Sequence, residues 1–384
     1  MKRAVIKVIA VICVIALCAA GGFAYWKFNS EDDSVEQHDF KITLPRLDTG
    51  KYPDDSTNAQ SERPYSVSTS NDIATAVGMS VLAAGGNAVD AAVAISYTLG
   101  ISEPYASGIG GGGGMLVYEI KTGKCTFYDY RACAGSAYYS SDEAAVPGLV
   151  AGMAAVHKDY GTISMYDLIT PAIEYAENGY TIGGALFHRI NYSKHLFGGY
   201  DWFFDENGRI LNEGDTIYHK KYAQTLRDIR RDGPDVFYKG YIAEDIAAVT
   251  DLTTADLASY EVIKSEALEG YFEGNTVYGC GGPLSGMTLI QMLEMADELD
   301  TPDPRYDPLT FTTHLKRFTA AAYSDRYKHV ADRTYYSIDE QSYISKSYIY
   351  ELLDMEPDEN AFADDESMET TSFSVVDSNG LVVS

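Results

Sequence analysis

The spacing of hydrophobic residues predicts two consecutive helices near the start of the folded sequence. Apolar residues recur every four positions across 73–81, and Ser70 or Asn71 stands where it can cap this helix. In the second helix, Asn87 and Asp90 occupy the N-cap and the third helical position, the arrangement of a capping box. The stripe expected to be buried comprises Val89, Ala92, Val93, Ser96 and Tyr97.

Two later stretches have the pattern strand, turn, strand. Leu116–Ile120 and Cys125–Tyr130 flank a turn at Thr122–Gly123, so we expect a hairpin. Near the end, apolar positions from Phe373 to Val383 flank the turn sequence Asp377-Ser-Asn-Gly. Helical periodicity dominates three other stretches, residues 147–180, 288–299 and 311–329. The chain is therefore expected to mix helices with antiparallel strands.

The N-terminal region divides into an apolar segment and a polar linker. Residues 1–26 place three basic side chains ahead of a continuous apolar run, which is typical of a signal peptide or membrane anchor. Cys18 also permits a lipoprotein interpretation, although Leu17 is too bulky for the usual lipid-attachment sequence. Residues 27–64 are polar and acidic, as in a tether. Because the basic end stays in the cytoplasm, the folded part is expected on the extracellular face, anchored or secreted.

Composition limits the partners of the folded part. The 384 residues carry 56 acidic and 29 basic side chains, a formal charge of −27, which repels nucleic acid. Hydrophobic residues make up 46%, enough for a packed core. No CxxC pair or Cys/His ligand spacing occurs, so we expect no metal and no cofactor. Cys125, Cys133 and Cys280 are expected to be packing residues.

Two sequence motifs resemble known functional sites but lack the surrounding pattern that those sites need. Gly108, Gly110 and Gly113 spell G-x-G-x-x-G, but a dinucleotide site needs strand, glycines, helix, whereas this sequence predicts helix, glycines, strand. We interpret these glycines as positions where the backbone passes close to another segment or a substrate. Ser285 lacks the G-x-S-x-G spacing of a nucleophile elbow.

The pair Thr370-Thr371 is a candidate for nucleophilic chemistry. A threonine hydroxyl needs a base, and a threonine that begins a chain can use its own α-amine, with an unperturbed pKa near ~8. Thr370 is placed to open the strand that follows, but the Glu369–Thr370 bond would have to be cut first. On spacing alone, two β-favouring residues at the start of a strand are the simpler interpretation.

The nucleophile interpretation is favoured once several other segments are considered, because together and in the same order they resemble the γ-glutamyltransferase family. The resemblance covers residues 65–384 and implies an N-terminal-nucleophile hydrolase, an αββα sandwich made as a zymogen that cuts itself in two. It divides the chain into a large-subunit region, 65–369, and the start of a small subunit, 370–384, so the sandwich is expected to be incomplete. The matching segments are Gly85–Val93, Ser107–Met115, Asp129–Arg131, Val146–Gly152 and Thr370–Asp377.

The resemblance also implies roles for particular residues. Thr370 corresponds to the nucleophile and new N-terminus, Thr371 to its supporting neighbour, and Arg131 to the arginine that binds the donor's α-carboxylate. The donor would be glutathione or, in the capsule branch of the family, poly-γ-glutamate, and the acceptor water or an amine. Ser372 stands where the family usually has histidine, and roughly the last third of the family's length is absent. The alternative is an inactive, truncated surface or binding protein on the same scaffold.

Overall fold

The computed structural model describes residues 64–136, 144–194, 201–333, 336–355 and 370–384. They form two compact units. Unit 1 contains the described residues of 114–129 and 263–355, and unit 2 contains those of 64–113, 130–262 and 370–384. The large-subunit region expected from the sequence therefore contributes to both units. Predictions made for residues 1–63 lie outside the described residues.

The two helices predicted near the start of the chain are present in unit 2. Helix α2 spans Asp72–Ala83, and Asn71 caps it by accepting a hydrogen bond from the Ile73 amide at 3.0 Å. Ile73 itself is only half-buried. Helix α3 spans Ala88–Ser102 and begins with the predicted capping box. The expectation of one buried stripe was too narrow, because every residue of α3 is buried among neighbouring helices and strands.

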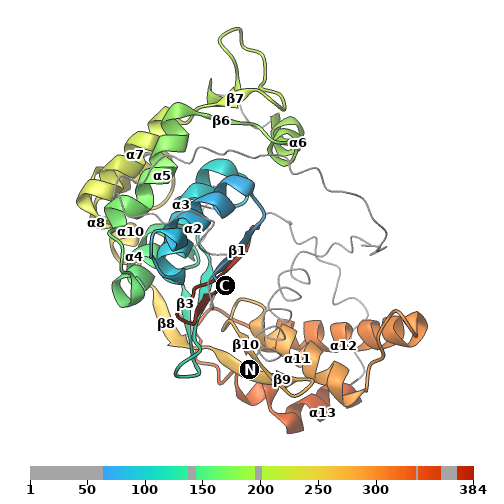
Figure 1. Cartoon of the computed structure of the whole chain (residues 1–384). Coiled ribbons are helices and arrows are strands. Elements are labelled where there is room, and N and C mark those ends of the chain that lie inside the picture. Colours follow the sequence, from blue (N-terminus) through green and yellow to red (C-terminus); the bar gives the residue numbers. More distant parts are fainter. Residues whose placement is uncertain (1–63, 137–143, 195–200, 334–335, 356–369) are drawn as a thin grey trace. The chain divides into compact units, whose positions relative to one another are not determined.

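The strands of unit 2 join the two ends of its sequence. β1 (Ser66–Thr69) pairs antiparallel with β11 (Phe373–Val376), which pairs antiparallel with β12 (Leu381–Val383). Figure 1 shows the blue N-terminal strand beside the dark red C-terminal strands, with α2 and α3 against them. The predicted strand–turn–strand is confirmed. However, β11 begins three residues after Thr370, so Thr370 precedes the strand rather than opening it.

The rest of unit 2 is mainly helical. The predicted helical stretch 147–180 contains two helices, α4 (Leu149–Tyr160) and α5 (Met165–Asn178), separated at Gly161. Both contact α3, and α5 also contacts α7 (Lys220–Asp232). The remaining elements are β4 (Cys133–Ala134), β5 (Ala145–Val146), β6 (Tyr180–Thr181), α6 (Gly184–Ser193), η3 (Asp201–Phe203), β7 (Thr216–Ile217), α8 (Asp235–Tyr238), α9 (Tyr241–Val249) and α10 (Thr254–Ala258).

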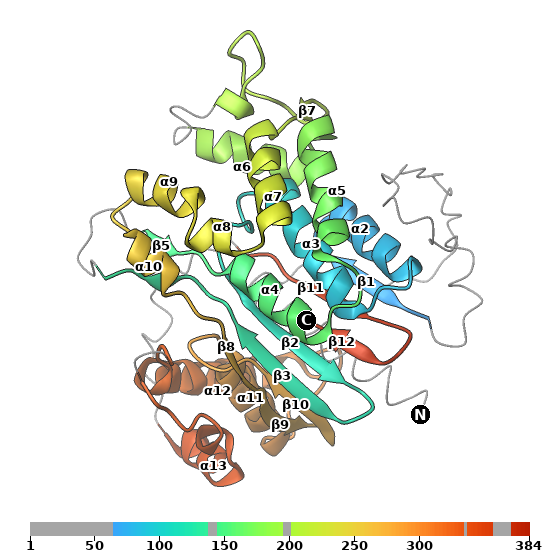
Figure 2. The ribbon, with the colours of Figure 1, turned by 90° about the vertical axis from the view of Figure 1, so that its left-hand side faces the viewer.

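Unit 1 contains the predicted hairpin. β2 (Gly114–Glu119) and β3 (Lys124–Asp129) pair as expected, and β8 (Ile263–Glu266) pairs with the other edge of β3. A second hairpin packs against α11, as Figure 2 shows. The remaining elements are β9 (Leu268–Phe272), β10 (Asn275–Gly279), α11 (Gly286–Glu298), α12 (Pro308–His329), η4 (Ser342–Ile344) and α13 (Lys346–Asp354).

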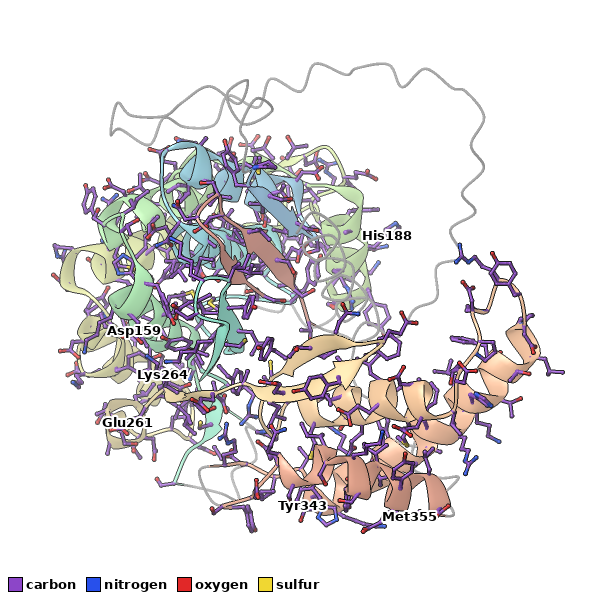
Figure 3. All side chains as sticks on the ribbon, turned by 60° about the horizontal axis from the view of Figure 1, so that its bottom comes forward. Asp159, His188, Glu261, Lys264, Tyr343 and Met355 are labelled. Atoms are coloured by element: carbon purple, nitrogen blue, oxygen red, sulfur yellow. The ribbon has the colours of Figure 1, made fainter. Side chains whose placement is uncertain are left out.

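A buried carboxylate organises the helical side of unit 1. Asp325 on α12 is 1% exposed and accepts hydrogen bonds from Gln291 at 2.7 Å and Tyr348 at 2.6 Å. His329 stacks on the ring of Tyr343, labelled in Figure 3, with ring centroids 4.3 Å apart. Since each partner belongs to a different element, these polar contacts join α11, α12, η4 and α13 beside their apolar core.

Cys125, Cys133 and Cys280 are free thiols, consistent with their predicted packing role. Burial raises the pKa of both Cys125 and Cys280 to about 12, so these two remain protonated and unreactive near neutral pH. No helix among the described residues has the length and apolarity to cross a membrane.

Asp90, the third residue of α3, is expected to be the more sensitive member of the capping box. It is 0% exposed; one carboxylate oxygen accepts from the Asn87 amide at 2.9 Å, and the other accepts from the Thr162 and Ile163 amides. Asp90→Asn leaves one acceptor oxygen and turns an amide donor toward backbone donors. We expect the free energy of unfolding to fall by about 2–4 kcal/mol, measured by urea denaturation.

Asp72→Asn is the matched control for this change. Asp72 is exposed in the first turn of α2, so it loses only a favourable interaction with the helix dipole. Its cost should stay below about 1 kcal/mol. Equal costs for the two variants would contradict the role assigned to Asp90.

Candidate active site

The Thr370-Thr371 pair lies at the edge of the strands of unit 2. Thr370 is exposed and Thr371 is half-buried, and both precede β11. The pairing of Phe373 with Thr69 brings this pair beside the residues that follow β1. Glu369, on the other side of the predicted cleavage bond, lies outside the described residues.

Thr371 takes part in a short chain of hydrogen bonds. Its hydroxyl oxygen lies 2.6 Å from the hydroxyl oxygen of Ser70, and Ser70 donates to a carboxylate oxygen of Glu103 at 2.8 Å. Ser70 stands between β1 and α2, and Glu103 is the C-cap of α3. Three segments far apart in the sequence therefore meet at Thr371. We call these three side chains the Thr371 relay.

Glu103 is held firmly at its end of the relay. Its residue is 4% exposed, and its amide donates to Leu99 at 2.7 Å. Its carbonyl accepts from the amides of Ala106 and Ser107 at 2.9 and 3.1 Å. Burial first, and then the charge of Glu103, raise the pKa of Tyr105, while Arg189 opposes the shift. The backbone of Glu103 is thus fixed at the end of α3.

The glycine segment between Glu103 and β2 makes close backbone contacts in part, because a Cβ on Gly110 would meet nothing within 4 Å whereas Gly112 is tightly packed. A Cβ atom added to Gly112 would lie 2.5 Å from the Ala132 nitrogen and the Tyr130 carbonyl oxygen. The Gly111 carbonyl accepts hydrogen bonds from the amides of Gly148 and Leu149, at the start of α4, at 2.9 and 3.0 Å. The order helix, glycines, strand is also confirmed, which is not the order of a dinucleotide-binding turn.

The backbone of Arg131 is braced by two tyrosines. Tyr260 donates its hydroxyl to the Arg131 carbonyl at 2.8 Å, and its ring stacks on Tyr238 with centroids 5.6 Å apart. Tyr238 donates to the Pro147 carbonyl at 2.8 Å and accepts from the Ala151 amide at 3.1 Å. The contact with Tyr260 holds the backbone carbonyl of Arg131 in place. The Arg131 residue itself is half-buried.

The structure therefore builds two clusters in unit 2, one around Thr371 and one around Arg131. The glycine segment connects them, because it starts at Glu103 and its Gly112 lies against the backbone beside Arg131. An arginine suits a carboxylate, and a hydroxyl suits attack on an acyl carbon. Among the described residues no group of three or more His, Cys, Asp or Glu side chains is arranged to hold a metal ion.

Sequence reasoning missed Ser70 and Glu103 as site residues. Ser70 was considered only as a helix cap, a role that Asn71 fills. Glu103 has no local pattern that distinguishes it from a surface acid. The only indication was chain order: Glu103 precedes the glycine segment, and Ser70 follows the first strand.

Comparisons with known proteins agree with this geometry. A family model described as Gamma-glutamyltranspeptidase matches residues 74–384. The Capsule biosynthesis protein CapD proenzyme of Bacillus anthracis is 34% identical over 382 residues, which cover 98% of this chain and 68% of that protein. The Glutathione hydrolase proenzyme of Bacillus subtilis (strain 168) is 34% identical over 319 residues, covering 74% of this chain and 53% of the relative.

The solved structures give the same result for the fold. A crystal structure of the transpeptidase enzyme CapD of Bacillus anthracis has a TM-score of 0.68 and 35% identity, covering 74% of this chain and 98% of that chain. This similarity confirms the predicted N-terminal-nucleophile hydrolase fold. The chain spans about two thirds of the capsule relative and about half of the glutathione hydrolase. On these matches, the chain belongs to the γ-glutamyltranspeptidase family.

Proposed function

We propose that this chain cuts itself between Glu369 and Thr370 and then transfers γ-glutamyl groups from an amide donor to water or an amine. The observation that carries the proposal is the placement of Thr370. It is exposed, it directly precedes the hydrogen-bonded Thr371, and it leads into a strand held by β1 and β12. Family membership supplies the reaction class, and both relatives described above are named as proenzymes.

The first reaction creates the catalyst. The Thr370 hydroxyl oxygen attacks the Glu369 carbonyl carbon, an ester C–O bond forms, the peptide C–N bond breaks, and the hydroxyl proton passes to the departing nitrogen. Water then hydrolyses the ester, which frees the Glu369 carboxylate and restores the hydroxyl. The released α-amine of Thr370 can serve as a base because its unperturbed pKa is near ~8.

The second reaction uses the same hydroxyl. Thr370 attacks the γ-glutamyl amide, its α-amine takes the hydroxyl proton and delivers it to the leaving amine, and a γ-glutamyl ester remains on the enzyme. Water or an amine then attacks that ester and restores the free threonine. Arg131 binds the donor's α-carboxylate, which holds the scissile bond in a fixed position. Glutathione-like peptides and poly-γ-glutamate both present this bond.

Substitution of Thr370 tests both reactions. We use the chain extended at its C-terminus by the region that completes its Bacillus anthracis relative, called the extended chain below. It should split into two chains, and N-terminal sequencing of the smaller should read Thr-Thr-Ser-Phe. Thr370→Ala should leave one uncut chain and lower γ-glutamyl release by about 10⁴-fold or more, because no nucleophile remains. Thr370→Ser should cut and retain part of the activity.

Thr225→Ala, a half-buried threonine on α7, is the control and should behave as the unmodified chain. Cleavage at the same bond in Thr370→Ala would overturn the assignment. A folded extended chain that stays intact and inactive would favour the alternative, a non-enzymatic surface protein on this scaffold.

Arg131→Ala is expected to weaken donor selection without stopping self-cleavage. A charge-assisted hydrogen bond to a carboxylate contributes about 1.5–3 kcal/mol, so kcat/KM for glutathione and for poly-γ-glutamate should fall about 10- to 150-fold. Arg131→Lys should recover only part of the loss, because an ammonium cannot bind bidentately. Arg209→Ala is the control, because Arg209 is 59% exposed and pairs with Asp205 and Asp215. Unchanged donor kinetics in Arg131→Ala would remove Arg131 from the site.

We also propose that residues 1–26 place the folded part outside the cell. Their basic residues precede the apolar run, so the preceding end stays in the cytoplasm. Protease added to intact cells should digest the protein, while a cytoplasmic marker stays whole. Digestion only after lysis would contradict this orientation.

A further inference from the structure

We infer that Ser70 and Glu103 are positioning residues for the nucleophile, and that they hold the Thr371 hydroxyl as a hydrogen-bond acceptor toward Thr370. The inference rests on the proposed function, because it assigns these two residues to the reactions of Thr370. Neither residue was expected at the site from the sequence.

The direction of the relay follows from counting protons. A serine hydroxyl carries one hydrogen, and Ser70 donates it to Glu103 at 2.8 Å. In the 2.6 Å contact between Ser70 and Thr371, the donor must therefore be Thr371. Since Thr371 gives its proton to Ser70, its oxygen keeps lone pairs that can only accept.

An accepting oxygen is useful beside Thr370. Before self-cleavage it can receive the proton of the Thr370 hydroxyl in a hydrogen bond, which orients that oxygen for attack. After cleavage it can accept from the α-amine of Thr370. Charge-assisted hydrogen bonds polarise their neighbours along a chain, so the carboxylate at the far end strengthens Thr371 as an acceptor.

A buried carboxylate is unfavourable at the position of Glu103. This residue caps the C-terminal end of α3, where the helix dipole favours a cation, and the last turn of α3 contains no basic residue. The residue is 4% exposed. The contact that the structure shows for its carboxylate is the hydrogen bond from Ser70 at 2.8 Å. Departures from local rules of this kind concentrate at functional sites.

Separate measurement of kcat and KM tests the role of the relay. The relay acts on the nucleophile and not on the donor, so Ser70→Ala in the extended chain should slow self-cleavage and lower kcat by about 10- to 100-fold with KM unchanged. Ser70→Thr should retain both self-cleavage and kcat, because threonine keeps the hydroxyl and the exposed position of Ser70 has room for the extra methyl group. Glu103→Gln should lower kcat by an intermediate amount. The amide oxygen can still accept from Ser70, but the amide nitrogen can instead donate to Ser70 and reverse the direction of the hydrogen bonds.

A double-mutant cycle tests whether Ser70 acts through Thr371. Ser70→Ala and Thr371→Ala should each lower kcat, and the double variant should be no slower than either single one. Thr75→Ala is the control: its hydroxyl makes a 2.9 Å contact with Thr69 at the start of α2 but takes no part in the relay. Its kinetics should match the unmodified chain.

The outcomes separate the inference from the proposed function. If the extended chain cuts itself and the two substitutions add independently, or kcat stays unchanged, the positioning role is overturned. If the unmodified extended chain never cuts, the proposed function fails. In that case the same cycle, measured by thermal unfolding of the 384-residue chain, tests the contact between Ser70 and Thr371. Coupled Tm shifts support the contact, and additive shifts overturn it.

Discussion

The pairing of β1 with β11 is the constraint on which the candidate site depends. It joins residues about 300 positions apart and sets Thr69 opposite Phe373. Side chains alternate between the two faces of a sheet, so a shift of one residue would move Thr371 away from Ser70. The placement of Thr371 beside Ser70 therefore depends on one strand register. Because β12 holds the other edge of β11, a cut before Thr370 would leave the new chain end in place.

Helix α3 also fixes the position of residues 371–377, because it contacts this segment near both ends. At its start, the Ala88 amide donates to the Asp377 carboxylate at 3.1 Å, and at its end Glu103 reaches Thr371 through Ser70. Fifteen helical residues span ~22 Å. The six steps from Thr371 to Asp377 span ~20 Å in extended form. The helix and the strand thus match in length, and a contact at each end keeps the strand from sliding.

Local elements of this fold could be predicted from the sequence, and contacts between distant segments could not. The capping box of α3, the β2–β3 hairpin and the C-terminal strand pair each depend on neighbouring residues, and each is confirmed. The assignment of Ser70 or Asn71 as a cap stayed open because either can bond to nearby amides. Only the folded structure shows that Asn71 caps α2 and Ser70 faces Glu103. The role proposed for Arg131 came from the resemblance, which carries no information about the relay.

The glycine segment explains how one stretch of chain can serve both clusters of the site. From Gly110 to Gly113 it has no side chains, so the path of this part depends on backbone contacts. Gly108 adopts a φ of +145°, and a Cβ on Gly100 would lie 2.8 Å from its Cα. Gly112 lies against the backbone of Tyr130 and Ala132. A larger residue at Gly112 would displace the backbone on either side of Arg131. The proposed roles of Thr371 and Arg131 can therefore be changed separately through their side chains, although the same segment lies between the two clusters.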